Sequence, residues 1–149
     1  MKNSDAKPGL FLEPFVLSQL VGSVIAKVVE GSGLGGKDFA VASSLAVWSE
    51  ATPSELASLL GMAPTTMSSV LGRLERRGLV ERLRDPDDGR RYVLRLTDEG
   101  MRLRNAAIKR FPEWLDRVRT HLGEDPDEVL EPMRRLERAL RAALDEPAG

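Results

Sequence analysis

The hydrophobic positions of residues 64–97 change their spacing halfway, from a helical period to a strand-like one. Apolar residues recur at helical spacing up to Gly78 and predict a helix with one buried face, formed by Met67, Val70, Leu71 and Leu74. In residues 92–96 the side chains alternate between the two faces of a predicted strand. An earlier strand-like run and the turn-forming residues 85–89, DPDDG, complete a β-hairpin with a charged tip.

A shorter helix is predicted immediately before this one. Thr52 offers an N-cap hydroxyl, Pro53 suits the first helical position, and Glu55 stands three residues after the cap. The helix should run over residues 54–60 and stop at Gly61, and we expect it to bury Leu56, Leu59 and Leu60. Two helices joined by a tight turn form a helix-turn-helix motif, which presents its second helix to the major groove of DNA. With the hairpin attached, the pattern predicts a winged helix-turn-helix.

Further helices are predicted on both sides of this motif. In residues 11–30 the apolar side chains cover more than one helical stripe, so that helix should be buried on two sides. Residues 37–49 suit a helix packed behind the motif, and Thr97 can cap a long helix over residues 98–122 with a kink at Pro112. The last helix has a narrow apolar seam made by Val129, Met133, Leu136, Leu140 and Leu144. Because one small domain rarely covers so much apolar surface, we expect a partner chain.

Residues 31–36, GSGLGG, match the dinucleotide-binding fingerprint G-x-G-x-x-G to the letter. That fingerprint requires a strand before it and a helix after it within a βαβ unit. The preceding segment has a helical period instead, so we interpret these residues as a connector between two helices. No cofactor is expected.

Length and composition place the chain among globular proteins. Its 149 residues suit one domain, and 42% hydrophobic with 30% charged residues is typical of an ordered fold. The N-terminus is polar and unlike a secretory signal, and no uninterrupted apolar segment is expected to approach the ~20 residues that span a bilayer. These features predict a cytoplasmic protein without a membrane partner.

Several chemistries are excluded by residue counts. The chain has no cysteine, which removes disulfides, thiolate metal sites and cysteine nucleophiles. Its single histidine, His121, lies at a predicted helix end, where it suits a C-terminal cap better than a metal ligand. We therefore expect neither an enzyme nor a metal site.

The charge is unevenly distributed along the chain. The formal net charge is −1, but residues 62–97 contain eight arginines and five acidic residues, a local charge of +3. A basic surface on an otherwise acidic chain favours binding of a polyanion such as nucleic acid.

Residues 54–100 resemble the core of the MarR (multiple antibiotic resistance regulator) family of bacterial transcription regulators. The motifs that carry the resemblance are LERRGLV at residues 74–80, the wing signature Asp85-Pro86-x-Asp88-x-Arg90, and the closing Leu96-Thr97-x-x-Gly100. The resemblance implies one mainly α domain over residues 1–149, with a winged helix-turn-helix at 37–97 and dimerisation helices at 10–30 and 98–145. It also implies a homodimer that binds a pseudo-palindromic operator in double-stranded DNA, as a regulator and in particular a repressor.

The predicted DNA contacts lie in the second helix of the motif and in the wing. Hydroxyl groups of the helix can bind base edges and phosphates, and Arg73 lies within reach of the phosphate backbone. By resemblance, Arg90 inserts into the minor groove, where A·T-rich DNA concentrates negative potential, and Asp88 orients its guanidinium. The full set is Pro64, Thr65, Thr66, Ser68, Ser69, Arg73, Arg84, Asp88, Arg90 and Arg91.

Members of the family also bind small aromatic effectors between the dimerisation helices and the DNA-binding lobe. The candidate wall residues in this chain are aromatic, although aromatic side chains at helical spacing equally suit a core: Phe15, Phe39, Trp48, Phe111 and Trp114. The identity of an effector is left open.

Three residues of the helix-turn-helix depart from the best pattern for reading DNA. Ala63 stands where family members often have a polar cap, and Ser69 stands where they often have a basic residue. Gly72 lowers helix stability by roughly 1 kcal/mol relative to alanine, unless it permits a close backbone approach. These departures keep open an alternative, a winged-helix interaction or architectural module that binds a protein or non-specific DNA.

Overall fold

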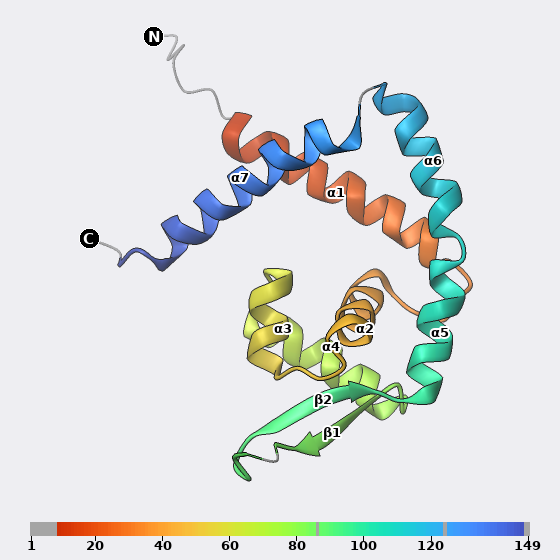
Figure 1. Ribbon diagram of the computed structural model, residues 1–149, viewed down its shortest axis with the longest axis vertical. Helices are drawn as coiled ribbons and strands as arrows, with labels where there is room; N and C mark the ends of the chain where they lie inside the picture. The colour runs from red at the N-terminus through yellow and green to blue at the C-terminus, as the bar shows by residue number, and fades with distance from the viewer. Residues whose placement is uncertain (1–8, 86, 124, 148–149) are drawn as a thin grey trace. The chain divides into compact units, whose positions relative to one another are not determined.

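The computed structural model describes residues 9–85, 87–123 and 125–147, and these are mainly helical (Figure 1). The chain divides into two compact units, residues 1–111 and residues 112–149. The elements, in chain order, are α1 (Gly9–Val29), α2 (Gly36–Trp48), α3 (Pro53–Leu60), α4 (Pro64–Arg76), β1 (Val80–Arg84), β2 (Tyr92–Leu96), α5 (Asp98–Ile108), α6 (Phe111–Leu122) and α7 (Pro126–Asp145).

Helices α3 and α4 form the predicted helix-turn-helix. The Thr52 hydroxyl accepts the N–H of Glu55 at 3.3 Å, and the Glu55 carboxylate accepts the N–H of Thr52 at 2.7 Å. This reciprocal capping box starts α3. The helix ends at Gly61, whose φ of +59° is left-handed. Of the three leucines expected to be buried in α3, Leu56 is buried and Leu60 is half-buried, but the expectation for Leu59 was wrong, since this residue is exposed.

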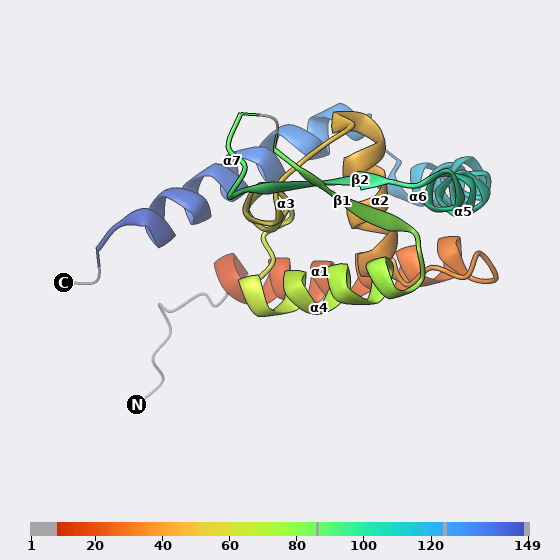
Figure 2. The same cartoon turned by 90° about the horizontal axis from the view of Figure 1, so that it is seen from below.

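Strands β1 and β2 form the predicted antiparallel hairpin, with Val80 paired to Leu96 and Arg84 paired to Tyr92. Backbone hydrogen bonds between Ala51 and Leu94, of 3.2 and 2.8 Å, attach β2 to the segment before α3. The loop that joins the strands reaches beyond α3 and α4 in both views (Figure 1 and Figure 2). The hairpin is therefore a wing that is anchored at its base and free at its tip.

The core of the first unit lies where the helix-turn-helix, the wing and α2 meet. Its largest fully buried side chains come from α1 to α4 and β2 and include Leu45, Leu56, Met67, Leu74 and Leu94. Helix α5 begins where the wing ends, with the Thr97 hydroxyl accepting the N–H of Gly100 at 3.1 Å. A methyl group on Gly100 would lie 2.0 Å from the carbonyl oxygen of Leu79, so only glycine fits this crossing.

Helix α1 corrects one expectation from the sequence. Its 21 residues, with a mean hydropathy of 1.6 in the most apolar window, are long and apolar enough by length and composition to cross a membrane. Only its last turn is buried, by Val28 and Val29, while large apolar side chains on residues 10–21 are exposed. The periodicity had suggested burial on two sides, so most of that surface is uncovered in the single chain.

The helix expected over residues 98–122 is two helices, α5 and α6, separated by a turn at residues 109–110. Pro112 lies in the first turn of α6, where backbone N–H groups have no partner within the helix, so the proline costs no hydrogen bond. The proline therefore begins a new helix rather than kinking one. In the second unit, α7 is the expected last helix, and its apolar seam is at least partly exposed, as at Met133 and Leu140.

The connector at residues 31–36 joins α1 to α2, and Gly31 and Gly33 have φ values of +78° and +81°. Since a helix precedes it, the connector lacks the strand that dinucleotide binding requires.

Candidate nucleic-acid interface

Helix α4 presents a polar face to solvent opposite its buried face. Met67, Val70, Leu71 and Leu74 are buried, as the helical spacing predicted. The residues between them project outward: Pro64, Thr65, Ser68 and Ser69 are exposed, and Thr66 is half-buried. A row of hydroxyl groups on an exposed helix is suited to contacts with base edges and phosphates.

The same face borders a shallow groove of about 360 Å³ that also involves α2. Its lining residues are Lys37, Thr65, Thr66, Ser69, Val70 and Arg73. Four predicted contact residues therefore share one surface, and Lys37 adds a cation that sequence reasoning missed. The sequence indicated only that Lys37 lies at the start of a helix, and this position alone does not predict a DNA contact.

Arg73 has an internal partner that the sequence did not reveal. Its Nε lies 3.1 Å from Oδ1 of Asp38, and its Nη2 donates to the same carboxylate. Asp38 is 3% exposed, whereas the side chain of Arg73 is 43% exposed. Hydrogen bonding to Asp38 raises the pKa of Arg73 above its ordinary value. Arg73 thus secures α4 to α2, and phosphate contact would use only its remaining exposed surface.

The wing tip is a cluster of exposed arginines held in a turn. Arg84, Arg90 and Arg91 are exposed, and the N–H of Asp85 donates to the carbonyl of Arg91 at 3.0 Å. Asp88 makes a backbone contact that the sequence did not predict. Its carboxylate accepts the backbone N–H of Arg90 at 3.0 Å, because an aspartate readily binds the backbone two residues ahead.

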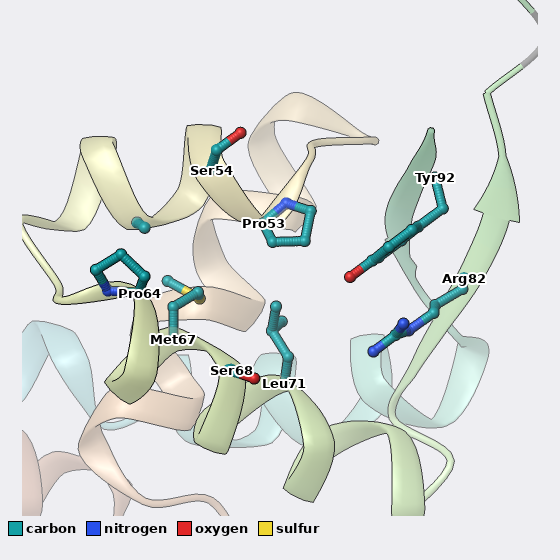
Figure 3. A pocket seen from close by; sticks show the side chains of 9 residues that line it. Pro53, Ser54, Pro64, Met67, Ser68, Leu71, Arg82 and Tyr92 are labelled. Atoms are coloured by element: carbon teal, nitrogen blue, oxygen red, sulfur yellow. The ribbon is translucent and has the colours of Figure 1, made fainter. Parts of the chain in front are cut away.

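At the base of the wing, Arg82 of β1 binds Glu75 of α4. Its Nε and Nη2 donate to the two carboxylate oxygens, the second at 3.0 Å, and this raises the pKa of Arg82. Its guanidinium carbon also lies 4.3 Å from the centre of the Tyr92 ring. Figure 3 shows Arg82 and Tyr92 along one side of a groove of about 260 Å³, opposite Pro53 and above Leu71.

The effector wall proposed from the five aromatic residues stays a prediction, and the structure shows the surroundings of each residue within its own unit. Phe39 is buried and stacks on Phe111 with ring centres 5.8 Å apart, which is a core contact. Phe15 and Trp48 are exposed, and Trp114 lies under the guanidinium of Arg117, 5.0 Å from its ring centre. None of the five lines either groove described above.

A helix-turn-helix with an exposed polar second helix, followed by an arginine-tipped hairpin, defines a winged-helix protein of the DNA-binding type. Residues 38–92 match the model of the MarR family. This match covers most of α2, the whole helix-turn-helix and strand β1 of the wing.

Solved structures of several transcriptional regulators have the same fold. PcaV, a transcriptional regulator from Streptomyces coelicolor solved with its natural ligand, is 28% identical, with a TM-score of 0.70 over 87% of this chain and 90% of PcaV. The M. tuberculosis regulator MosR in complex with DNA has a TM-score of 0.77 at 23% identity, covering 89% of this chain and 96% of MosR. A mutant E. coli MarR in complex with operator DNA has a TM-score of 0.72 at 22% identity, covering 85% and 89% of the two chains. A comparison with curated proteins finds no match.

Proposed function

We propose that this protein is a sequence-specific DNA-binding transcriptional repressor that acts as a homodimer on a pseudo-palindromic operator. The observation that carries the proposal is the exposed hydroxyl face of α4, formed in part by Thr65, Ser68 and Ser69, in one unit with an exposed wing tip bearing Arg90. One element suits the major groove and the other suits the minor groove. MosR and E. coli MarR, which share the fold, were solved with DNA.

The proposed dimer uses the apolar surfaces that the single chain leaves uncovered. Helix α1 exposes eight large hydrophobic side chains: Leu10, Phe11, Leu12, Phe15, Val16, Leu17, Leu20 and Val21. Val28 and Val29 bury the C-terminal end of this helix in the first unit, which also contains the helix-turn-helix proposed to bind DNA. A second copy of the chain is therefore a better cover than a membrane, and we place the protein in the cytoplasm.

Release by a small aromatic effector is a further part of the proposal. Such a ligand must bind the DNA-free arrangement of the dimer more tightly than the DNA-bound one, since only differential affinity shifts an equilibrium. PcaV was solved with its natural ligand, which supports the same kind of control here.

Selection of bound sequences from a random duplex pool tests the central proposal. With purified protein, we expect enrichment of an inverted repeat whose half-sites lie roughly 10 base pairs apart, as two-fold symmetry requires. Sedimentation should give twice the chain mass of 16.4 kDa. A pool that remains random after several rounds would favour the alternative, an architectural or protein-binding module.

A further inference from the structure

Arg82 occupies a position of the wing where the strand pattern calls for an apolar residue. Side chains of paired residues in an antiparallel hairpin share a face, and Arg82 is paired with Leu94. On that face Val80, Leu94 and Leu96 are buried against the helices. Arg82 therefore lies on the same face of the hairpin as these buried residues, although its own side chain is 50% exposed.

Glu75 is the first partner of Arg82. It lies in the last turn of α4, with a side chain that is 22% exposed, and it receives two parallel hydrogen bonds from the guanidinium of Arg82. Such a fork fixes direction as well as distance, because both N–H groups must point at the carboxylate together. The pair therefore restrains the angle between β1 and the end of α4.

Tyr92 is the second partner. It is paired with Arg84, so it is the diagonal neighbour of Arg82 on the inner face, and its ring lies under the guanidinium at 4.3 Å. The contact joins both strands to the same guanidinium, and the side-by-side placement of the two groups is visible in Figure 3. Arg90, at the tip of the wing, lies only two residues before Tyr92 in the sequence.

We propose that Arg82 is a positioning residue that, through Glu75 and Tyr92, sets the direction of the wing relative to α4. In this role Arg82 determines whether Arg90 and the hydroxyls of α4 reach the same DNA duplex together. The proposal rests on the DNA-binding function proposed above. It assigns no DNA contact to Arg82 itself.

A double-mutant cycle tests this role, with affinity for the selected operator duplex measured by fluorescence anisotropy. Arg82→Met keeps the length of the side chain but removes the fork. We expect it to weaken binding about fivefold or more in the wild-type background and by less than about twofold in an Arg90→Ala background. The losses should be non-additive because a misdirected wing cannot lose a contact that is already absent.

Arg95→Met is the matched control. Arg95 forms a similar pair with Glu81, at 2.8 Å, but on the outer face of the same hairpin and with no partner from α4. Its effect on affinity should be the same in both backgrounds. If Arg82→Met, like the control, caused the same loss of affinity in both backgrounds, the proposal would be overturned. A direct DNA contact or a general loss of stability would give such additive losses.

Conservative variants separate positioning from stability. Arg82→Lys retains the charge without the planar fork and should resemble Arg82→Met. Tyr92→Phe retains the ring face and should lose less affinity than Tyr92→Leu. If Arg82→Met does not fold, the cycle is run with Glu75→Gln, with the same expected non-additivity. Failure of the wild-type protein to select any sequence would instead refute the proposed function, so the two failures are distinguishable.

Discussion

Arg73 of α4 binds Asp38 of α2 through two nitrogen atoms, with its Nε 3.1 Å from Oδ1. Among the residues that the structure describes, Asp38 is the one charged side chain that is buried. Its Oδ2 also accepts the N–H of Gly35 at 3.4 Å and lies 3.8 Å from Nη1 of Arg77. One carboxylate thus caps α2 and binds both Arg73 of α4 and Arg77, the residue directly after α4.

We expect Asp38→Ala to destabilise the protein by about 1–3 kcal/mol, because its hydrogen-bond donors lose their partner in a buried position. This loss of stability should be smaller than the loss seen when a fully buried ion pair is broken, because the side chain of Arg73 is 43% exposed and can be solvated without Asp38. Urea denaturation measures this change. Asp116→Ala, in an exposed pair 3.9 Å from Arg119, should change stability by less than about 0.5 kcal/mol. Equal effects of the two substitutions would contradict the role assigned to Asp38.

Gly100 and Gly72 both lie in helices, but we expect substitution by alanine to have opposite effects on stability at the two positions. The methyl group of Gly100→Ala would meet the backbone oxygen of Leu79 at 2.0 Å, so α5 must shift away from the wing. We expect a loss of about 3 kcal/mol or more. Gly72 has open space within 4 Å of an added methyl group, so Gly72→Ala should stabilise α4 by about 0.5–1 kcal/mol. Thermal unfolding followed by circular dichroism would show the two midpoints move in opposite directions.

The fold of the DNA-binding part could be predicted because its determinants are local. The capping box of Thr52 and Glu55, the left-handed Gly61 and the alternation in β2 each specify a backbone conformation within a few residues. The break between α5 and α6 was missed because a proline in the first turn of a helix and a proline that kinks a helix give the same apolar spacing around them.

For the candidate site, the sequence could predict which side chains are exposed but not which partners they bind. Helical spacing identified the outward face of α4, but the ion pair of Asp38 with Arg73 joins residues 35 positions apart, and no local pattern encodes it. The one available signal was the position of Asp38, a charged residue directly before the apolar residues Phe39 to Ala42. Likewise, Arg82 on the inner face of the wing was visible as a break in alternation, but its partner Glu75 was not.

Glu55 makes the start of α3 sensitive to acid. Hydrogen bonds from the backbone N–H and then the hydroxyl of Thr52 lower the pKa of Glu55 below its ordinary value. Because the pKa is lower in the folded state, the ionised carboxylate stabilises the fold at pH values above the pKa of the unfolded state. This stabilisation is lost as the pH falls through the pKa of the folded state. We expect Glu55→Gln to cost about 0.5–1 kcal/mol at pH 7 and less at pH 3.

Urea denaturation of both proteins at the two pH values measures this difference. Glu137→Gln is a suitable control, since Glu137 is an exposed helical residue that accepts only from the side chain of Arg141 at 2.9 Å. A penalty for Glu55→Gln that stays constant between pH 7 and pH 3 would show that the carboxylate charge does not stabilise the cap.

Arg90 at the wing tip provides the most direct test of DNA binding. Its side chain is exposed, and its only described hydrogen bond to a side chain is made by its backbone N–H to Asp88, so truncation should leave the fold intact. We expect Arg90→Ala to weaken operator binding by about 1–3 kcal/mol, roughly 5-fold to 150-fold. The loss should be larger on duplexes with A·T-rich flanks, because a narrow minor groove attracts the guanidinium more strongly.

Gel-shift titrations with A·T-rich and G·C-rich flanking sequences measure both effects. Arg102→Ala is the control, since Arg102 is an exposed arginine that binds Glu99 at 2.7 Å within α5, outside the proposed interface. It should bind both duplexes as the unaltered protein does. If Arg90→Ala also bound both duplexes with undiminished affinity, while thermal unfolding showed an intact fold, the wing would have no part in DNA recognition and α4 alone would have to account for it.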